Sequence, residues 1–75
     1  MMSVVETIKS CGARKEMVYI TYDGEQRLVE PYSFRDNRFF GWCLMRDEIR
    51  SFTISKITSA QASGKHFTPR FDVEF

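Results

Sequence analysis

The spacing of hydrophobic residues changes near residue 16 of this 75-residue chain. Before that point the apolar side chains share one face at helical spacing, and Ser3 stands three residues before Glu6, which is the spacing of a capping box. We therefore expect a short helix over residues 3–11, with Gly12 as its C-terminal stop. Because so short a helix is marginal alone, it must dock on the rest of the chain.

From Met17 onward the side chains alternate between two faces, which is typical of β-strands. Asp23-Gly24 is a strong hairpin signal, and residues 35–37 and 46–48 are expected to form further turns. Pro31 marks an edge strand or a bulge. The expected strands are 17–22, 26–34, 38–45, 49–54 and 56–62, followed by a turn at 63–65 and an irregular tail over 68–75.

Five short strands joined by tight turns predict a mainly β fold, either a small, strongly bent sheet or a partly closed barrel. The short N-terminal helix would cover one end. We divide the single domain into a helix and linker (1–16) and a β unit with its tail (17–75). The strand Phe39–Met45 is apolar on both faces, so we expect it to be covered by the core on one side and by a helix or a partner on the other.

The charge is nearly balanced, with 11 Lys and Arg against 10 Asp and Glu. This balance excludes a bulk electrostatic grip on nucleic acid but leaves room for a local basic patch. Two cysteines are too few for a disulfide scaffold. No secretory signal and no apolar run long enough to span a membrane is visible, so we expect a cytoplasmic protein without a membrane partner.

No set of residues with catalytic spacing stands out. His66 is the only histidine and is expected to be a solvated residue beside a turn; nothing local supports its pairing with Cys43. One histidine and two distant cysteines do not make a zinc site, and no glycine-rich phosphate loop is present. We therefore expect a binding protein rather than an enzyme, with no cofactor and no metal.

Arg50 is the most informative residue, because it shares a strand face with Phe52. A guanidinium in line with core residues is costly unless it is paired or lines a pocket. One interpretation is an internal salt bridge to Glu30 or Glu48. The other is a cationic rim for an anion such as a phosphate.

Further arginines and aromatic residues extend the second interpretation. If they converge, guanidinium groups for phosphates and rings for bases would together suit single-stranded nucleic acid or a nucleotide. For the aromatic residues the alternative is simple core packing. The candidate ligand-binding residues are Arg50, Arg46, Arg27, Tyr22 and Trp42.

The order of these features resembles the WYL domain family over residues 17–75. Residues 18–32 run from a strand ending in Tyr through a turn to Arg-x-Val-x-Pro-Tyr, and Gly41-Trp42-Cys43 precedes an Arg-x-Phe strand at residues 50–52. The Trp-Tyr-Leu tripeptide that names the family falls at residues 37–39, where only the apolar third position survives. Lys56 replaces the usual Arg. No ligand contact is therefore carried over from the naming tripeptide.

The resemblance implies a small Sm-like, SH3-type barrel that serves as a sensor or regulatory module in bacterial transcription regulators and defence proteins. It implies negatively charged ligands, chiefly single-stranded nucleic acid or nucleotides, and places Arg50 as the pocket arginine. We expect a standalone short form without a helix-turn-helix, acting through a regulatory protein partner, through self-association or as a bare ligand binder. The alternative function is a protein–protein interaction or dimerisation module, using Phe39–Met45 or the aromatic tail to form a homo-oligomer.

Overall fold

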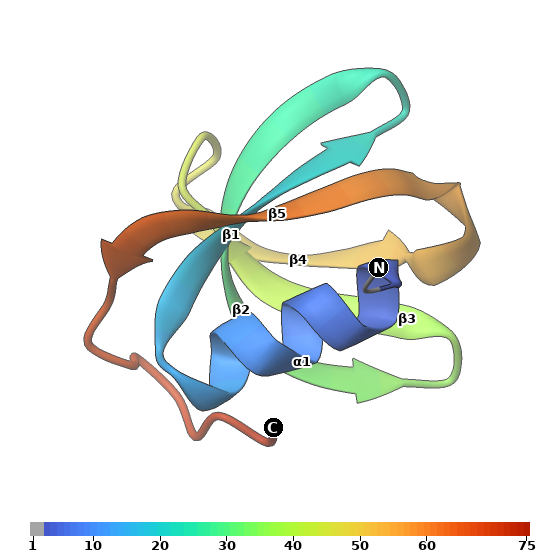
Figure 1. Cartoon of the computed structure of the whole chain (residues 1–75). Coiled ribbons are helices and arrows are strands. Elements are labelled where there is room, and N and C mark those ends of the chain that lie inside the picture. Colours follow the sequence, from blue (N-terminus) through green and yellow to red (C-terminus); the bar gives the residue numbers. More distant parts are fainter. Residues whose placement is uncertain (1–2) are drawn as a thin grey trace.

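The computed structural model describes residues 3–75, which form one α-helix and five strands (Figure 1). The mainly β prediction is confirmed. The elements are α1 (Val4–Ala13), β1 (Glu16–Tyr22), β2 (Glu25–Arg35), β3 (Arg38–Cys43), β4 (Glu48–Thr53), the 3-10 turn η1 (Ile54–Lys56) and β5 (Ile57–His66).

All five strands belong to one antiparallel sheet in the order β4-β3-β2-β1-β5. The first four strands follow one another, and β5 then crosses back to pair with β1. Figure 1 shows the strands curving around α1. Within residues 3–75 the two edge strands, β4 and β5, do not pair with each other, so the sheet is open and the expected barrel is not confirmed.

Two hairpin turns form where the sequence predicts them. Asp23 and Gly24 have φ values of 54° and 79°, and Asp36 and Asn37 have φ values of 49° and 65°. Positive φ at both central positions matches the right-handed twist of the flanking strands, and Asp, Asn and Gly adopt it at low cost. These turns fix the registers of β1 with β2 and of β2 with β3.

The helix begins as predicted and ends later than predicted. Ser3 is the N-cap, and its side chain and that of Glu6 form the reciprocal capping box. Gly12 does not stop the helix, which continues to Ala13 before Lys15 turns the chain at φ 57°. Gly12 has another role, because a Cβ there would overlap the ring of Phe75 at the end of the chain.

The expected turn at residues 63–65 is wrong, because β5 continues through it to His66. Gly64 lies in an irregularity between the pairs Val18–Ala62 and Glu16–His66. The N–H group of Gly64 donates to the Glu16 carboxylate at 2.9 Å, and Arg14 Nε donates to the same carboxylate at 3.1 Å. These two bonds lower the pKa of Glu16. The Gly64 N–H group, which makes no regular strand-pairing bond at this irregularity, is therefore satisfied by a residue that is distant in the sequence.

The core lies between α1 and the inner face of the sheet. Its fully buried members are Ile8, Cys11, Val18, Ile20, Val29, Phe39 and Cys43, with Phe52 1% exposed. Neither cysteine forms a disulfide in the part of the chain that the structure describes. Burial raises the pKa of the Cys11 thiol. Cys43 is fully buried while His66 is exposed, so the structure does not bring this pair together.

β2 carries a bulge after Pro31, as one of the two sequence interpretations predicted. The register with β3 shifts between Pro31 and Ser33, which leaves Tyr32 as the extra residue. The tail, residues 67–75, then runs back past β1 and ends beside α1 (Figure 1). The backbone N–H of Glu74 donates to the Tyr32 carbonyl at 2.8 Å. The bulge is thus one of the places where the tail is attached.

Gly41 gives the first test of this packing. A Cβ at Gly41 would overlap Val29 and lie 2.8 Å from the Glu30 carbonyl oxygen, which belongs to the backbone and cannot move freely. We expect Gly41→Ala to lower the free energy of unfolding by about 1–3 kcal/mol in urea denaturation. As a control, Ser59→Thr adds a methyl group at an exposed strand position and should change stability by less than about 0.5 kcal/mol. Equal stabilities would contradict this packing.

Candidate functional site

Tyr22 joins three strands at one end of the inner face. Its ring lies edge-on to the ring of Phe52, with centroids 5.0 Å apart. The Arg27 guanidinium carbon is 6.0 Å from the Tyr22 ring centroid, within the range of a cation–π contact. The backbone N–H of Thr53 donates to the Tyr22 hydroxyl at 3.2 Å, which lowers the pKa of Tyr22. Tyr22 is therefore held by β4 while it faces Arg27.

Arg27 is a buried cation with little to neutralise it. It pairs with Ile20 on β1, so its side chain leaves the inner face beside the core, and the residue is only 8% exposed. Its Nη2 lies 3.6 Å from Glu25 Oε2, and the Glu25 side chain is 65% exposed. Within residues 3–75 its buried Nε has no hydrogen-bond partner. An unpaired buried donor is costly, which makes this position favourable for an incoming acceptor.

Arg50 lies on the inner face, as its alternation with Phe52 predicts. It stands opposite Gly41 on β3, and its Nη1 is 3.6 Å from Glu48 Oε1. Of the two salt-bridge partners considered from the sequence, the structure has Glu48. The Glu48 side chain is 58% exposed, so this pair is long and solvated and contributes little to stability.

The other two candidates, Arg46 and Trp42, lie in different parts of the sheet. Arg46 is exposed in the turn at residues 44–47, which begins beside Leu28 of β2, whereas Tyr22 is bonded to Thr53 at the other end of β4. Trp42 alternates with Gly41 and Cys43 and therefore lies on the outer face. Of the expected five, Tyr22, Arg27 and Arg50 lie on the inner face, and we call these three, together with Arg46 in the adjoining turn, the inner site.

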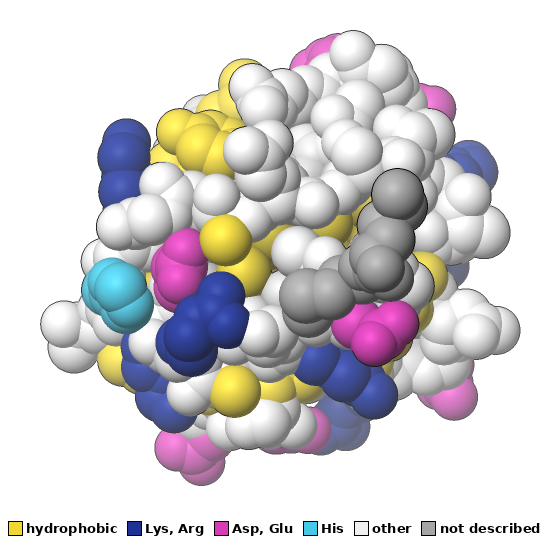
Figure 2. Space-filling view, in the orientation of Figure 1, with side chains coloured by type: hydrophobic (Ala, Val, Ile, Leu, Met, Phe, Trp, Pro, Cys, Tyr) yellow, Lys and Arg dark blue, Asp and Glu magenta, His cyan; other side chains and the backbone are white. Residues whose placement is uncertain are grey.

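Carboxylates surround the inner site. Asp23, Glu25, Asp47 and Glu48 each lie close in the sequence to one of its three arginines. On the face that carries α1, Figure 2 likewise shows basic and acidic side chains interspersed. Long-range attraction of an anion is therefore weak here, and any anion binding depends on short hydrogen bonds from the guanidinium groups.

On the outer face a second arginine is held much more closely. The Tyr32 hydroxyl donates to Glu30 Oε1 at 2.7 Å, and Arg70 Nε donates to the same oxygen at 3.2 Å. The backbone N–H of Arg70 donates to the Tyr32 hydroxyl at 2.9 Å. The Arg70 guanidinium carbon lies 4.3 Å from the centroid of the Trp42 ring. Burial raises the pKa of Tyr32 to about 12.

The tail is irregular, as predicted, and sequence reasoning missed this cluster because an irregular segment has no periodicity that tells where its side chains lie. The only local signal was Glu30, an acidic residue within a largely buried strand. Glu30 is 3% exposed, and such a carboxylate requires a cation or donors close by.

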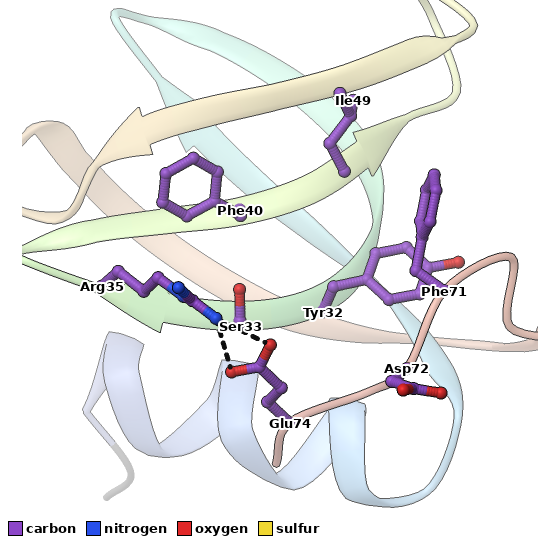
Figure 3. A pocket seen from close by; sticks show the side chains of 8 residues that line it. All are labelled: Tyr32, Ser33, Arg35, Phe40, Ile49, Phe71, Asp72 and Glu74. Atoms are coloured by element: carbon purple, nitrogen blue, oxygen red, sulfur yellow. Dashed lines mark hydrogen bonds and ion pairs between the residues drawn. The ribbon is translucent and has the colours of Figure 1, made fainter.

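A cavity of about 450 Å³ lies beside this cluster (Figure 3). Phe40 and Ile49 line it from β3 and β4, and Phe71 lines it from the tail. Arg35 and Glu74 form an ion pair at its rim, with Nη2 and Oε2 3.2 Å apart. The remaining lining residues are Tyr32, Ser33 and Asp72. None of the candidates Arg27, Arg46, Arg50, Tyr22 or Trp42 lines this cavity.

A family model described as the WYL domain matches residues 3–62. The chain belongs to the WYL domain family. The resemblance seen in the sequence is thereby confirmed. The matched segment of this WYL domain takes in α1 and all strands as far as the middle of β5, and the tail lies beyond it.

The WYL domain is also similar to a solved structure, Proteasome accessory factor B/C (PafBC) of Arthrobacter aurescens. The identity is 20%, the TM-score is 0.74, and the likeness covers 89% of this chain. The chain spans 13% of the length of that protein. At this identity the likeness concerns the fold alone. A comparison with curated proteins finds no match.

Residues 3–75 were compared with the requirements of a metal site and of a membrane-spanning helix. Among the described residues, no three His, Cys, Asp or Glu side chains are grouped so that they could hold a metal ion. In the same residues, no helix is long and apolar enough to cross a membrane.

Arg27 provides a test of whether the inner site has a structural role. Arg27→Met keeps the apolar stem and removes a buried guanidinium that has only a long ion pair, so the free energy of unfolding should fall by less than about 1 kcal/mol or should rise. Ile20→Ala, directly opposite on β1, should cost about 2–5 kcal/mol in the same urea titration. A comparable loss for Arg27→Met would make this guanidinium a structural group.

Proposed function

We propose that this WYL domain is a ligand-sensing regulatory module that binds single-stranded nucleic acid or a nucleotide-type anion at the inner site. The observation that carries the proposal is the state of Arg27, whose guanidinium is buried, loosely paired and short of an acceptor at Nε. A phosphate supplies several acceptor oxygens in a geometry that a guanidinium matches.

The inner site fits such a ligand in two ways. Arg27 and Arg50 are each paired at 3.6 Å with an exposed carboxylate, so a phosphate can displace Glu25 and Glu48 at small cost. The ring of Tyr22 borders Arg27 and offers a surface for a base, while Arg46 extends the cationic rim. These residues bind and orient an anion; we propose no reaction, cofactor or metal for them.

The wider setting is part of the same proposal. The WYL family supports a regulatory role in bacterial transcription or defence, in the cytoplasm, exerted through a regulatory protein partner or through self-association. A Sm-like, SH3-type architecture is supported by the strand order, in which β5 leaves a 3-10 turn and crosses to pair with β1.

Oligonucleotide titration tests the inner site. We expect a labelled oligothymidylate of about 12 nucleotides to bind at low salt. The logarithm of the affinity should fall against the logarithm of the salt concentration with a slope between about −1.4 and −2.1, for two or three phosphate contacts. Arg50→Ala should weaken binding about tenfold or more, since a hydrogen bond to a charged group contributes about 1.5–3 kcal/mol. Fluorescence anisotropy measures both effects.

Arg38→Ala is the matched control for Arg50→Ala. Arg38 is an exposed arginine that alternates with the core residue Phe39, so its side chain lies on the outer face of β3, where it donates to Ser51 Oγ at 3.3 Å. Its replacement should leave the affinity within about twofold, because it makes no contact with the inner site. Absence of binding at low salt, for both DNA and RNA and with folding verified by circular dichroism, would overturn the proposed function.

A second candidate function is dimerisation through the outer face. Met45, Ile49 and Phe71 are large apolar side chains that are exposed, and Ile49 lies on the edge strand β4. Two other tail rings pack within the chain, Phe67 against Tyr32 and Phe75 against Phe34. This candidate predicts a homodimer by light scattering that Ile49→Lys converts to a monomer. A monomeric mass for the wild type at every concentration would dismiss it.

A further inference from the structure

The outer face contains a site shaped for an arginine side chain, formed by Glu30, Tyr32 and Trp42 and called here the arginine site. Glu30 Oε1 accepts from Tyr32 and from Arg70, and the Trp42 ring covers the guanidinium at 4.3 Å. A carboxylate, a phenol and an indole together satisfy both the charge and the flat face of a guanidinium. A lysine side chain has no flat guanidinium to lie against the Trp42 ring and no Nε–H group to donate to Glu30.

The site and its occupant differ in how firmly each is held. Glu30 and Tyr32 are each 3% exposed and belong to the central strand β2. The Arg70 side chain is 43% exposed, Phe71 is 51% exposed, and the tail that carries them contains no helix or strand. The arginine site is therefore built into the sheet, whereas its occupant lies on an irregular segment that is tied to the domain farther along, at Glu74 and Phe75.

The chemistry of any replacement is set by Glu30. If the tail lifts away, the carboxylate loses its only cationic partner within residues 3–75 while remaining part of a tight strand. The Glu30 carboxylate, still bonded to the Tyr32 hydroxyl, then favours a cation that restores the lost charge-assisted hydrogen bond. The cavity bordered by Phe40, Ile49 and Phe71 provides room for an apolar side chain next to that cation.

We propose that the arginine site is a docking site for an extended segment of a partner protein that carries an arginine followed by an aromatic residue, and that the tail occupies it in cis until such a segment displaces it. The tail itself has this pattern in Arg70 and Phe71. The centroid of the Phe71 ring lies 5.4 Å from that of the Tyr32 ring and 6.2 Å from that of the Trp42 ring. This site lies on the opposite face of the sheet from the inner site. It goes beyond the function proposed above and does not depend on it.

A peptide with the sequence of residues 67–75, Phe-Thr-Pro-Arg-Phe-Asp-Val-Glu-Phe, serves as the probe. The full-length wild type should bind the labelled peptide weakly, because the tethered tail competes at a high effective concentration. The Arg70→Ala variant has a weakened competitor and should bind the peptide about tenfold more tightly. Replacing the peptide arginine by alanine or by lysine should abolish this gain.

Two further variants keep the test decisive if Arg70→Ala folds poorly. Phe71→Ala removes a half-exposed ring and keeps the cation, so it should also raise peptide affinity. Arg38→Ala leaves the tail and the arginine site intact and should match the wild type. Fluorescence of Trp42, the only tryptophan, reports occupancy directly.

Three outcomes would overturn the proposal. In the first, the folded Arg70→Ala and Phe71→Ala variants bind the peptide no better than the wild type. In the second, the alanine-substituted peptide binds as well as the arginine peptide. In the third, the wild type doubles its mass with concentration and Arg70→Ala does not, which would make the occupant the tail of a second copy. Because oligonucleotide binding uses the other face, its loss would leave all three readouts unchanged.

Discussion

The alternation of side chains along β2 decides what each face of the sheet can bind. β2 is the central strand, with β1 on one side and β3 on the other. Arg27 and Val29 point to the inner face, where they meet the core, and Glu30 points to the outer face. A shift of one residue would exchange these groups and bury the wrong charges. The register set by the Asp23-Gly24 turn therefore fixes both sites at once.

The two faces use the same kinds of charged group with opposite results. On the inner face, arginines stand 3.6 Å from carboxylates whose side chains are more than half exposed, so the pairs are loose. On the outer face, the carboxylate of Glu30 is almost completely buried and the arginine approaches to 3.2 Å. Desolvation of the acid, rather than the identity of the residues, makes the second pair tight. A loose pair costs little to break, while a tight pair selects its partner.

Features governed by neighbouring residues could be predicted from the sequence. The capping box at Ser3, the Asp23-Gly24 turn and the inner-face position of Arg50 each follow from a local spacing, and all three are present. Features that depend on distant segments could not be predicted. The strand continues through Gly64 because the Glu16 carboxylate, 48 positions away, accepts its N–H. Gly12 is small because the ring of Phe75 packs on it, and not because the helix stops there.

Trp42 shows why spacing alone could not assemble the whole candidate site. The apolar strand that contains Trp42 suggested that other groups cover both of its faces. Alternation placed Trp42 on the other face of the strand from Gly41 and Cys43, but neither rule says on which face the arginines lie. The tail answers this by bringing Arg70 to Trp42 on the outer face. On β3 and β4, the pair Trp42–Ile49 is directly followed by the pair Gly41–Arg50. Ile49, on the apolar outer face, and Arg50, on the inner face, thus belong to consecutive residue pairs of one β-ladder. A displacement of β4 against β3 therefore moves both side chains.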